Sequence, residues 1–212
     1  MSRLISRSFL IGGALLLAGS ALHPHEHVDN GTLEEQFHAM FTDPHWYPAH
    51  VLLLIGLAFM TVAVVGLARA RPASLPGRTT QFAATAVVVG TAAMVLHLIA
   101  KLDNPHIVAG ENTPLLYAHA AVETVTVPML GIAFAMLAAA GGRCRVLGNP
   151  FVAVLGIIGG LGYALAGVTA PFMATFTPLF DLVSLVGVWA VIVGAMQLVR
   201  GRHRRSLHEV AR

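Results

Sequence analysis

Three histidines lie near the same end of three separate apolar segments of the sequence. His50 begins one apolar run, while His97 and His119 each stand about one helical turn from the end of another. Because a helix rises about 1.5 Å per residue and successive spans run in opposite directions, all three are expected within roughly 8 Å of one membrane face. Imidazole is the commonest metal ligand and the usual proton carrier near neutral pH. The shared level of the three histidines predicts a site for metal, haem or proton chemistry.

Two carboxylates accompany these histidines. Glu123 follows His119 by four residues, which puts it on the same helix face one turn deeper. Asp181 begins the last apolar segment just after Pro178, at a similar depth. A charged side chain inside a bilayer costs about 2.5–3.5 kcal/mol on insertion scales, so these groups are expected to face one another or a wet cavity. If the protein is an enzyme, Glu123 is its predicted catalytic, proton-transferring residue.

Four interpretations of these polar residues compete. The leading one is a zinc, copper or iron site in which the histidines supply nitrogen and a carboxylate supplies oxygen. The second is haem b, with two of the histidines as axial ligands and Gly90 or Gly131 making room for the ring. The third is a proton or substrate pathway. The fourth is structural, with the histidines at helix ends and Glu123 paired with Lys101.

A second group of histidines lies in the run His-Pro-His-Glu-His that starts at residue 23. Alternate histidines with a glutamate can bind Cu²⁺ or Zn²⁺ in an extended chain, and the same run can also be a solvated polar linker. We hypothesise that it collects metal and passes it to the membrane site. The predicted metal ligands are therefore His50, His97, His119, Asp181, His23, His25 and His27.

The segments that must position these residues are long enough to cross a bilayer. Hydrophobic residues make up 56% of the 212-residue chain and charged residues only 11%, against roughly 25% charged residues in a soluble domain. A spanning helix needs about 20 mostly apolar residues. Five segments meet this requirement, at about 50–68, 81–100, 114–140, 147–170 and 178–199, and the N-terminal segment at about 4–22 is a sixth candidate. The sequence predicts an all-α polytopic bundle of six transmembrane helices.

The N-terminal segment has two interpretations. Residues 1–22 have the basic start, apolar middle and small-residue end of a signal peptide, and they also suit a retained signal-anchor. Cleavage of residues 1–21 would leave five spans. After it come a His-rich segment at 23–49, the bundle at 50–199 and a basic tail at 200–212. A capping-box pattern predicts a short interfacial helix at about 32–42, and Trp46 and Tyr47 are expected in an aromatic belt at the membrane surface.

Charges divide sharply between the two ends of the predicted spans. Every basic residue except Lys101 lies in the segments 1–7, 69–80, 141–146 and 200–212. Basic residues concentrate in cytoplasmic segments of membrane proteins. The pattern predicts a multi-pass protein of the cell (inner) membrane, with a cytoplasmic C-terminus and the His-rich segment outside.

Several functions lack support in the sequence. The single cysteine, Cys144, excludes an intrachain disulfide, and no nucleotide-binding or hydrolase motif is present. Metal handling or redox chemistry with a lipophilic small molecule is the leading hypothesis. The alternatives are a cytochrome-like haem protein, or a non-catalytic membrane subunit or small transporter with a structural polar cluster. The expected partners are membrane lipid and a second copy or larger membrane complex, with no nucleic acid.

Overall fold

The computed structural model describes residues 1–24, 35, 39–40, 42–100, 106, 109, 111, 113–169 and 174–210. It leaves the side chains of residues 100, 116, 119, 120, 174, 175, 177 and 202–210 outside the description. His25, His27, Lys101 and most of the interfacial helix predicted at 32–42 therefore lie outside the described residues.

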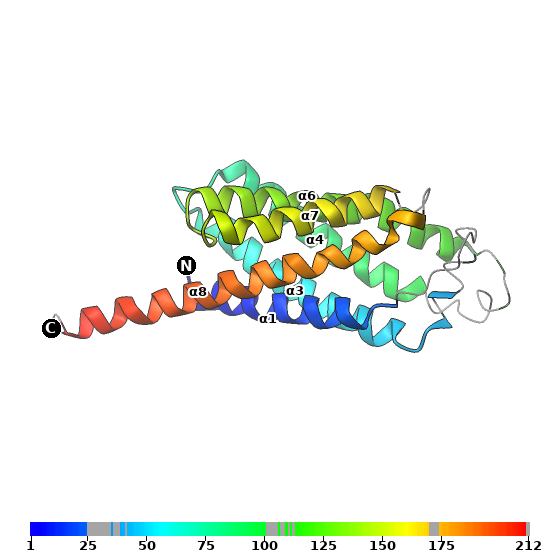
Figure 1. Cartoon of the computed structure of the whole chain (residues 1–212), viewed down its shortest axis with the longest axis horizontal. Coiled ribbons are helices and arrows are strands. Elements are labelled where there is room, and N and C mark those ends of the chain that lie inside the picture. The colour runs from blue at the N-terminus through cyan, green and yellow to red at the C-terminus, as the bar shows by residue number, and fades with distance from the viewer. Residues whose placement is uncertain are drawn as a thin grey trace.

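The described part of the chain is helical and contains no strand. The elements are α1 (Arg3–Leu22), α3 (Trp46–Ala70), α4 (Gly77–Ala100), α6 (Pro114–Arg143), α7 (Pro150–Thr169), the 3-10 helix η2 (Ala174–Leu182) and α8 (Val183–Val210), as Figure 1 shows. Within the described residues, six helices are long and apolar enough to cross a membrane. The predicted all-α polytopic bundle is confirmed.

The last predicted span begins differently from the expectation. The sequence places a helix from Pro178, whereas the chain forms the 3-10 helix η2 around this proline and becomes α-helical only at Val183. Proline has no backbone N–H to donate to an α-helical hydrogen bond. 3-10 geometry is common at helix N-termini, although η2, at nine residues, is longer than most 3-10 segments. It carries Asp181 at the start of the span.

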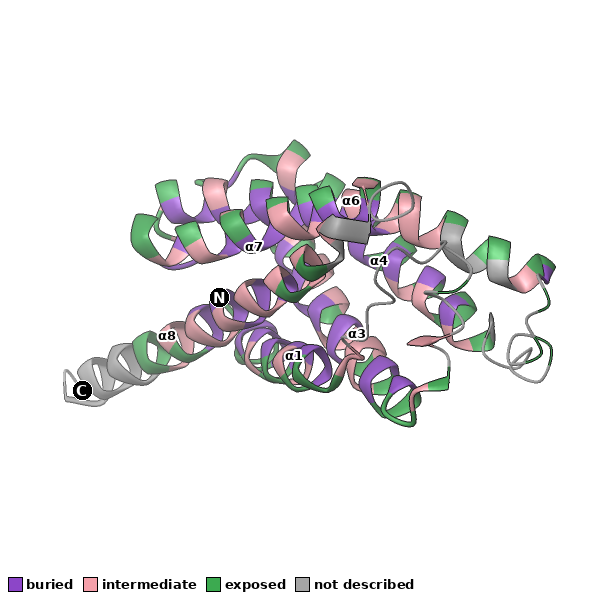
Figure 2. Cartoon of the chain, turned by 45° about the vertical axis from the view of Figure 1, so that its right-hand side comes forward, coloured by how far each residue is buried: buried purple, intermediate pink, exposed green. Residues whose placement is uncertain are grey.

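The helices form a ring in chain order. Each of α1, α3, α4, α6, α7 and α8 packs on the next, and α8 packs back on α1. Buried residues face the inside of this ring, while large apolar residues such as Val62, Leu96 and Phe151 remain exposed on the outside (Figure 2). An apolar exterior around a packed interior suits a bundle surrounded by lipid.

Helix α1 closes the ring through close backbone contacts. Phe9 is fully buried and meets Trp189 of α8 edge to face, with ring centroids 5.8 Å apart. A Cβ placed on Gly12 would lie 2.9 Å from the Gly56 carbonyl oxygen of α3. One placed on Gly13 would lie 2.6 Å from the Gly187 carbonyl oxygen of α8. The N-terminal segment is therefore packed as a full member of the bundle.

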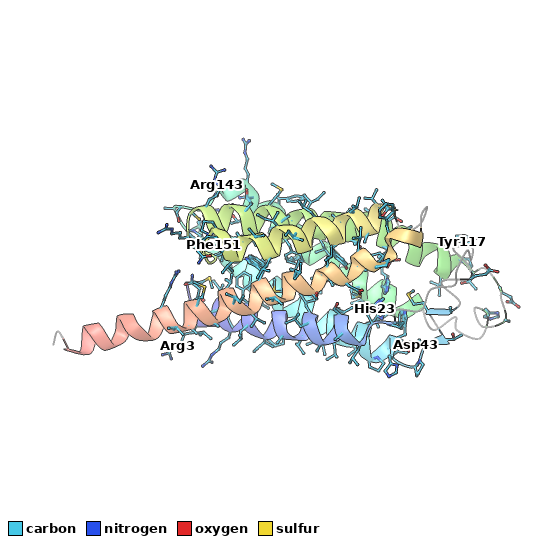
Figure 3. The ribbon with its side chains drawn as sticks, in the orientation of Figure 1. Arg3, His23, Asp43, Tyr117, Arg143 and Phe151 are labelled. Atoms are coloured by element: carbon cyan, nitrogen blue, oxygen red, sulfur yellow. The ribbon has the colours of Figure 1, made fainter. Side chains whose placement is uncertain are left out.

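The two ends of the bundle differ in chemistry. His23, Asp43 and Tyr117 lie at one end, which we call the histidine end, and Arg3 and Arg143 lie at the other, the arginine end (Figure 3). Helix α8 runs past the other helices at the arginine end (Figure 1). The segregation of charges read from the sequence is thus a segregation between the ends of one bundle.

We expect Gly13→Ala to destabilise the folded protein by about 1–3 kcal/mol, because the new methyl group would overlap the α8 backbone, which cannot move like a flexible side chain. The measurement is the free energy of unfolding in detergent. Gly77→Ala is the matched control, since a Cβ there meets nothing within 4 Å. Equal stability of Gly13→Ala and the parent protein would contradict the close α1–α8 contact.

Candidate functional site

A cavity of about 80 Å³ follows the axis of the ring from the histidine end inward. All six spanning helices and η2 contribute to its wall, with Leu16, Leu53, Met94, Val122, Tyr163, Phe180 and Val183 among the lining residues. A single water needs about 10–15 Å³ measured in this way, so the cavity has room for several waters or a hydrated ion. A cavity bordered by every helix is a consequence of the ring arrangement itself.

The lining changes character along the axis. His23, His50 and His97 line the cavity near the helix ends, whereas Leu130 and Phe134 line its deeper part on α6. Glu123 and Phe134 are separated by roughly 16 Å of helix, given 1.5 Å per residue. The cavity thus has a polar mouth and an apolar floor.

Three imidazoles form a cluster at this mouth. We call His23, His50 and His97 the histidine cluster. The ring centroids of His50 and His97 are 4.8 Å apart with an interplanar angle of 23°, and those of His23 and His50 are 4.8 Å apart at 49°. His50 and His97 are both buried, although α3 and α4 contribute them from distant parts of the sequence.

The Trp46 indole forms a wall against two of these rings. Its centroid lies 3.9 Å from that of His50 and 5.7 Å from that of His97, and it is nearly parallel to both rings. The Trp46–His97 distance is well below the sum of the Trp46–His50 and His50–His97 distances, so the three rings do not form one straight column. His50 and His97 are nevertheless close and nearly parallel, at a separation where a small movement of either ring would let both bind one proton or metal ion.

A hydrogen bond fixes the chemical state of His50. Its Nδ1 lies 2.7 Å from the Trp46 carbonyl oxygen one turn earlier in α3. A carbonyl oxygen only accepts, so Nδ1 is the donor and carries the ring proton. The basic lone pair of the neutral ring is then on Nε2. Donation of one ring nitrogen to a backbone carbonyl is the usual way in which a metal-binding histidine is oriented.

The burial of Trp46 differs from the sequence prediction. Trp46 has 0% of its surface exposed, whereas Tyr47 next to it is 39% exposed. Only Tyr47 thus has the exposure expected of a residue in an aromatic belt. The available signal for Trp46 was its spacing, since it precedes His50 by four residues and so shares its helix face.

Both predicted carboxylates line the same cavity. Glu123 comes from α6 and Asp181 from η2. Tyr163 of α7, which the sequence analysis missed, also lines it and packs edge to face on Phe180 at 6.0 Å between ring centroids. A tyrosine inside an apolar segment is a signal in itself, because its hydroxyl group needs a polar partner or water.

The remaining residues predicted for the site, His119, Gly90 and Gly131, differ in where the structure places them. His119 lies in α6 one turn before Glu123, and its side chain is outside the description. Gly90 lines the cavity, while Gly131 packs against Gly160 of α7. Among the side chains that the structure describes, no group of three histidine, cysteine, aspartate or glutamate residues is already arranged to hold a metal ion. The described candidate ligands therefore share one cavity without forming a complete coordination shell.

We expect Trp46→Ala to lower the free energy of unfolding by about 3–5 kcal/mol, because it removes a fully buried indole and leaves His50 and His97 without their wall. Chemical denaturation in detergent is the measurement. Tyr47→Ala, one position along the same helix, is the control and should cost much less because this side chain is 39% exposed. Similar losses for both variants would argue against the packing described for Trp46.

Comparisons with known proteins do not place the chain in a family. No protein-family model matches it, and neither a curated protein nor a solved structure does so. The function must therefore be argued from the chemistry of the cavity.

Proposed function

We propose that this membrane protein binds a transition metal, zinc, copper or iron, at the histidine end of its axial cavity. There it would handle the metal or use it for redox chemistry with a lipophilic molecule. The observation that carries this proposal is the close pair of buried imidazoles, His50 and His97, in a cavity that also holds Glu123. Two imidazoles with nearby carboxylates are a donor set that suits these metals.

The proposed ligands follow from the geometry. His50 would bind through Nε2, because its Nδ1 donates to the Trp46 carbonyl oxygen. His97 would supply the second nitrogen, and Glu123 or Asp181 an oxygen. A further imidazole would come from His23, which already contacts His50, or from His119 on α6. Metal–nitrogen bonds of about 2.0–2.1 Å would require the third donor to move toward the pair.

The shape of the cavity supports a lipophilic partner. An amphipathic molecule could place its polar group among the histidines and its apolar part against Leu57, Leu130 and Phe134. Glu123 lies between these regions along α6 and is the group proposed to accept or donate a proton. A metal at the mouth would act as Lewis acid or redox centre next to that group.

The orientation in the membrane is part of the proposal. Exposed arginines such as Arg69, Arg71 and Arg143 lie at the end of the bundle where α3 and α6 finish. Basic residues mark the cytoplasmic side. The histidine end would then face outward, where metal ions and an acidic loop region meet.

Haem b is the alternative cofactor, and it requires a defined distance between its two histidine ligands. Two axial imidazoles face each other across the iron, which separates their ring centroids by roughly 6 Å. The His50–His97 centroid distance is only 4.8 Å, so this pair suits a shared small ion better than a porphyrin. A haem would need a different pair of ligands, one that includes His23 or His119.

The metal content tests the proposal directly. We expect protein purified without a metal-affinity tag to contain zinc, copper or iron in stoichiometric amount by mass spectrometry. Its visible spectrum should contain no Soret band. Such a band would favour haem, and folded protein that remains free of both after isolation from metal-replete cells would contradict the proposal and favour a non-catalytic subunit or small transporter.

Metal binding by the same purified protein can be followed through tryptophan fluorescence. The chain has only two tryptophans, so Trp189→Phe leaves Trp46 as the sole reporter, stacked on His50. Cu²⁺ should quench it, and His50→Gln or His97→Gln should weaken binding at least tenfold because each removes a ligand nitrogen. His45→Gln is the matched control, since this exposed histidine pairs with Asp43 outside the cavity. Loss of binding in all three variants would contradict the assignment.

Glu123→Gln tests the carboxylate separately. The change keeps the size of the side chain and removes its charge, so we expect about tenfold weaker metal binding with normal membrane insertion. Glu111→Gln is the control, because Glu111 is exposed and contacts His106 instead of lining the cavity. Unchanged metal affinity in Glu123→Gln would give this residue a structural role.

A further inference from the structure

A second cavity lies at the arginine end, far from the histidine cluster. It encloses about 470 Å³ between the start of α1, the end of α3, the turn joining α6 to α7, and α8. Arg145 and Arg200 line it together with Ile5, Leu67 and Pro72. The candidate spans end nearby, at Ala70, Arg143 and Gly201. The cavity therefore lies where the hydrocarbon region of a bilayer gives way to the head groups.

Hydrogen bonds attach the α6–α7 turn to α8 at this cavity. The Gln197 side-chain amide donates to the Val146 carbonyl oxygen at 2.5 Å. About one helical turn further along α8, Arg200 Nη1 donates to the Arg145 carbonyl oxygen at 3.4 Å. Because a guanidinium group has five N–H donors, this contact leaves Arg200 able to donate to a ligand as well. Arg145 and Arg200 are thus held close together where the α6–α7 turn packs on α8.

The backbone of Arg145 is in a conformation that favours glycine. Its φ is 56°, in the left-handed region, just after α6 ends at Arg143. Glycine is the usual residue at such a helix end because it has no Cβ. An arginine adopts this conformation only at an energetic cost, so its side chain is a candidate for a function at this position.

The charged side chains among the described lining residues of this cavity are all basic. Two arginines line it, and no described lining residue is acidic. The acidic residues whose side chains the structure describes are Glu35, Asp43, Glu111, Glu123 and Asp181, and all belong to segments at the histidine end. Glu209 follows Arg200 by nine residues in α8, and its side chain lies outside the description. An anion entering this cavity would meet positive charge without a competing carboxylate from the described acidic residues.

We propose that this cavity binds the phosphate of an anionic membrane lipid. Arg145 and Arg200 would contact the phosphate oxygens, a geometry for which guanidinium groups are well suited. Ile5, Leu67 and Pro72 would contact the apolar part of the lipid where its chains enter the bilayer. Basic pockets between helices at a membrane surface are typical lipid head-group sites. The apolar wall is the reason to assign a lipid and not a free phosphate ion.

Thermal unfolding of the delipidated full chain in detergent tests this inference. Phosphatidylglycerol should raise Tm by several degrees, and the same amount of phosphatidylcholine should not. Arg200→Gln should weaken the apparent affinity for phosphatidylglycerol about fivefold, the effect of about 1 kcal/mol per basic residue. Arg143→Gln is the matched control, because this exposed arginine ends α6 two residues before Arg145 but does not line the cavity.

Arg145→Gly separates lipid binding from folding. Glycine relieves the left-handed strain, so the lipid-free variant should be at least as stable as the parent protein. It should nevertheless lose most of the response to phosphatidylglycerol. An equal response in Arg143→Gln and Arg145→Gly would overturn the site, and an equal Tm increase with inorganic phosphate or glycerol phosphate would overturn the assignment to lipid.

Discussion

Backbone contact between α1 and its two neighbours closes the ring of helices. Gly12 and Gly13 allow α1 to touch the carbonyl groups of α3 and α8, and no larger residue fits without displacing those backbones. In lipid, helix association depends on such packing because the surrounding chains are as apolar as the helices. Side chains such as Met60, Phe134 and Trp189 fill part of the ring's interior. The space that they leave at the histidine end is the axial cavity.

Closure of the ring also determines which chemistry the membrane region can hold. Polar groups in contact with lipid are costly, whereas the axial cavity has room for water and for other polar side chains. His50 illustrates the point, since its Nδ1 proton is satisfied by the carbonyl oxygen of Trp46 within its own helix. In the proposed metal site, the other ring nitrogen would be the metal ligand. Glu123 and Asp181 enter the same enclosed space from different elements.

Helix spans and the level of residues along them could be predicted from the sequence because both depend on local quantities, hydropathy and rise per residue. The proximity of His50 and His97 follows from that level, but the contact between their nearly parallel rings depends on helix rotation, which tertiary packing determines. His23 shows the difference between what local sequence patterns and what tertiary packing determine. Its alternate spacing with His25 and His27 indicates an extended chelating run, yet the end of α1 at Leu22 brings it against His50. Trp46 was expected at the membrane surface, and its burial against His50 and His97 likewise depends on how α3 packs against α4.

The cavities at the two ends share a structural element. Helix α1 lines the axial cavity through Leu16 and Ser20 and the arginine-end cavity through Ile5. Helix α8 likewise begins beside the first cavity and carries Arg200 at the second. A lipid bound between α1, α8 and the α6–α7 turn would hold together the contact at which the ring closes. Binding at the arginine end would then favour the closed ring on which the histidine cluster depends, since any ligand specific to a folded arrangement stabilises it.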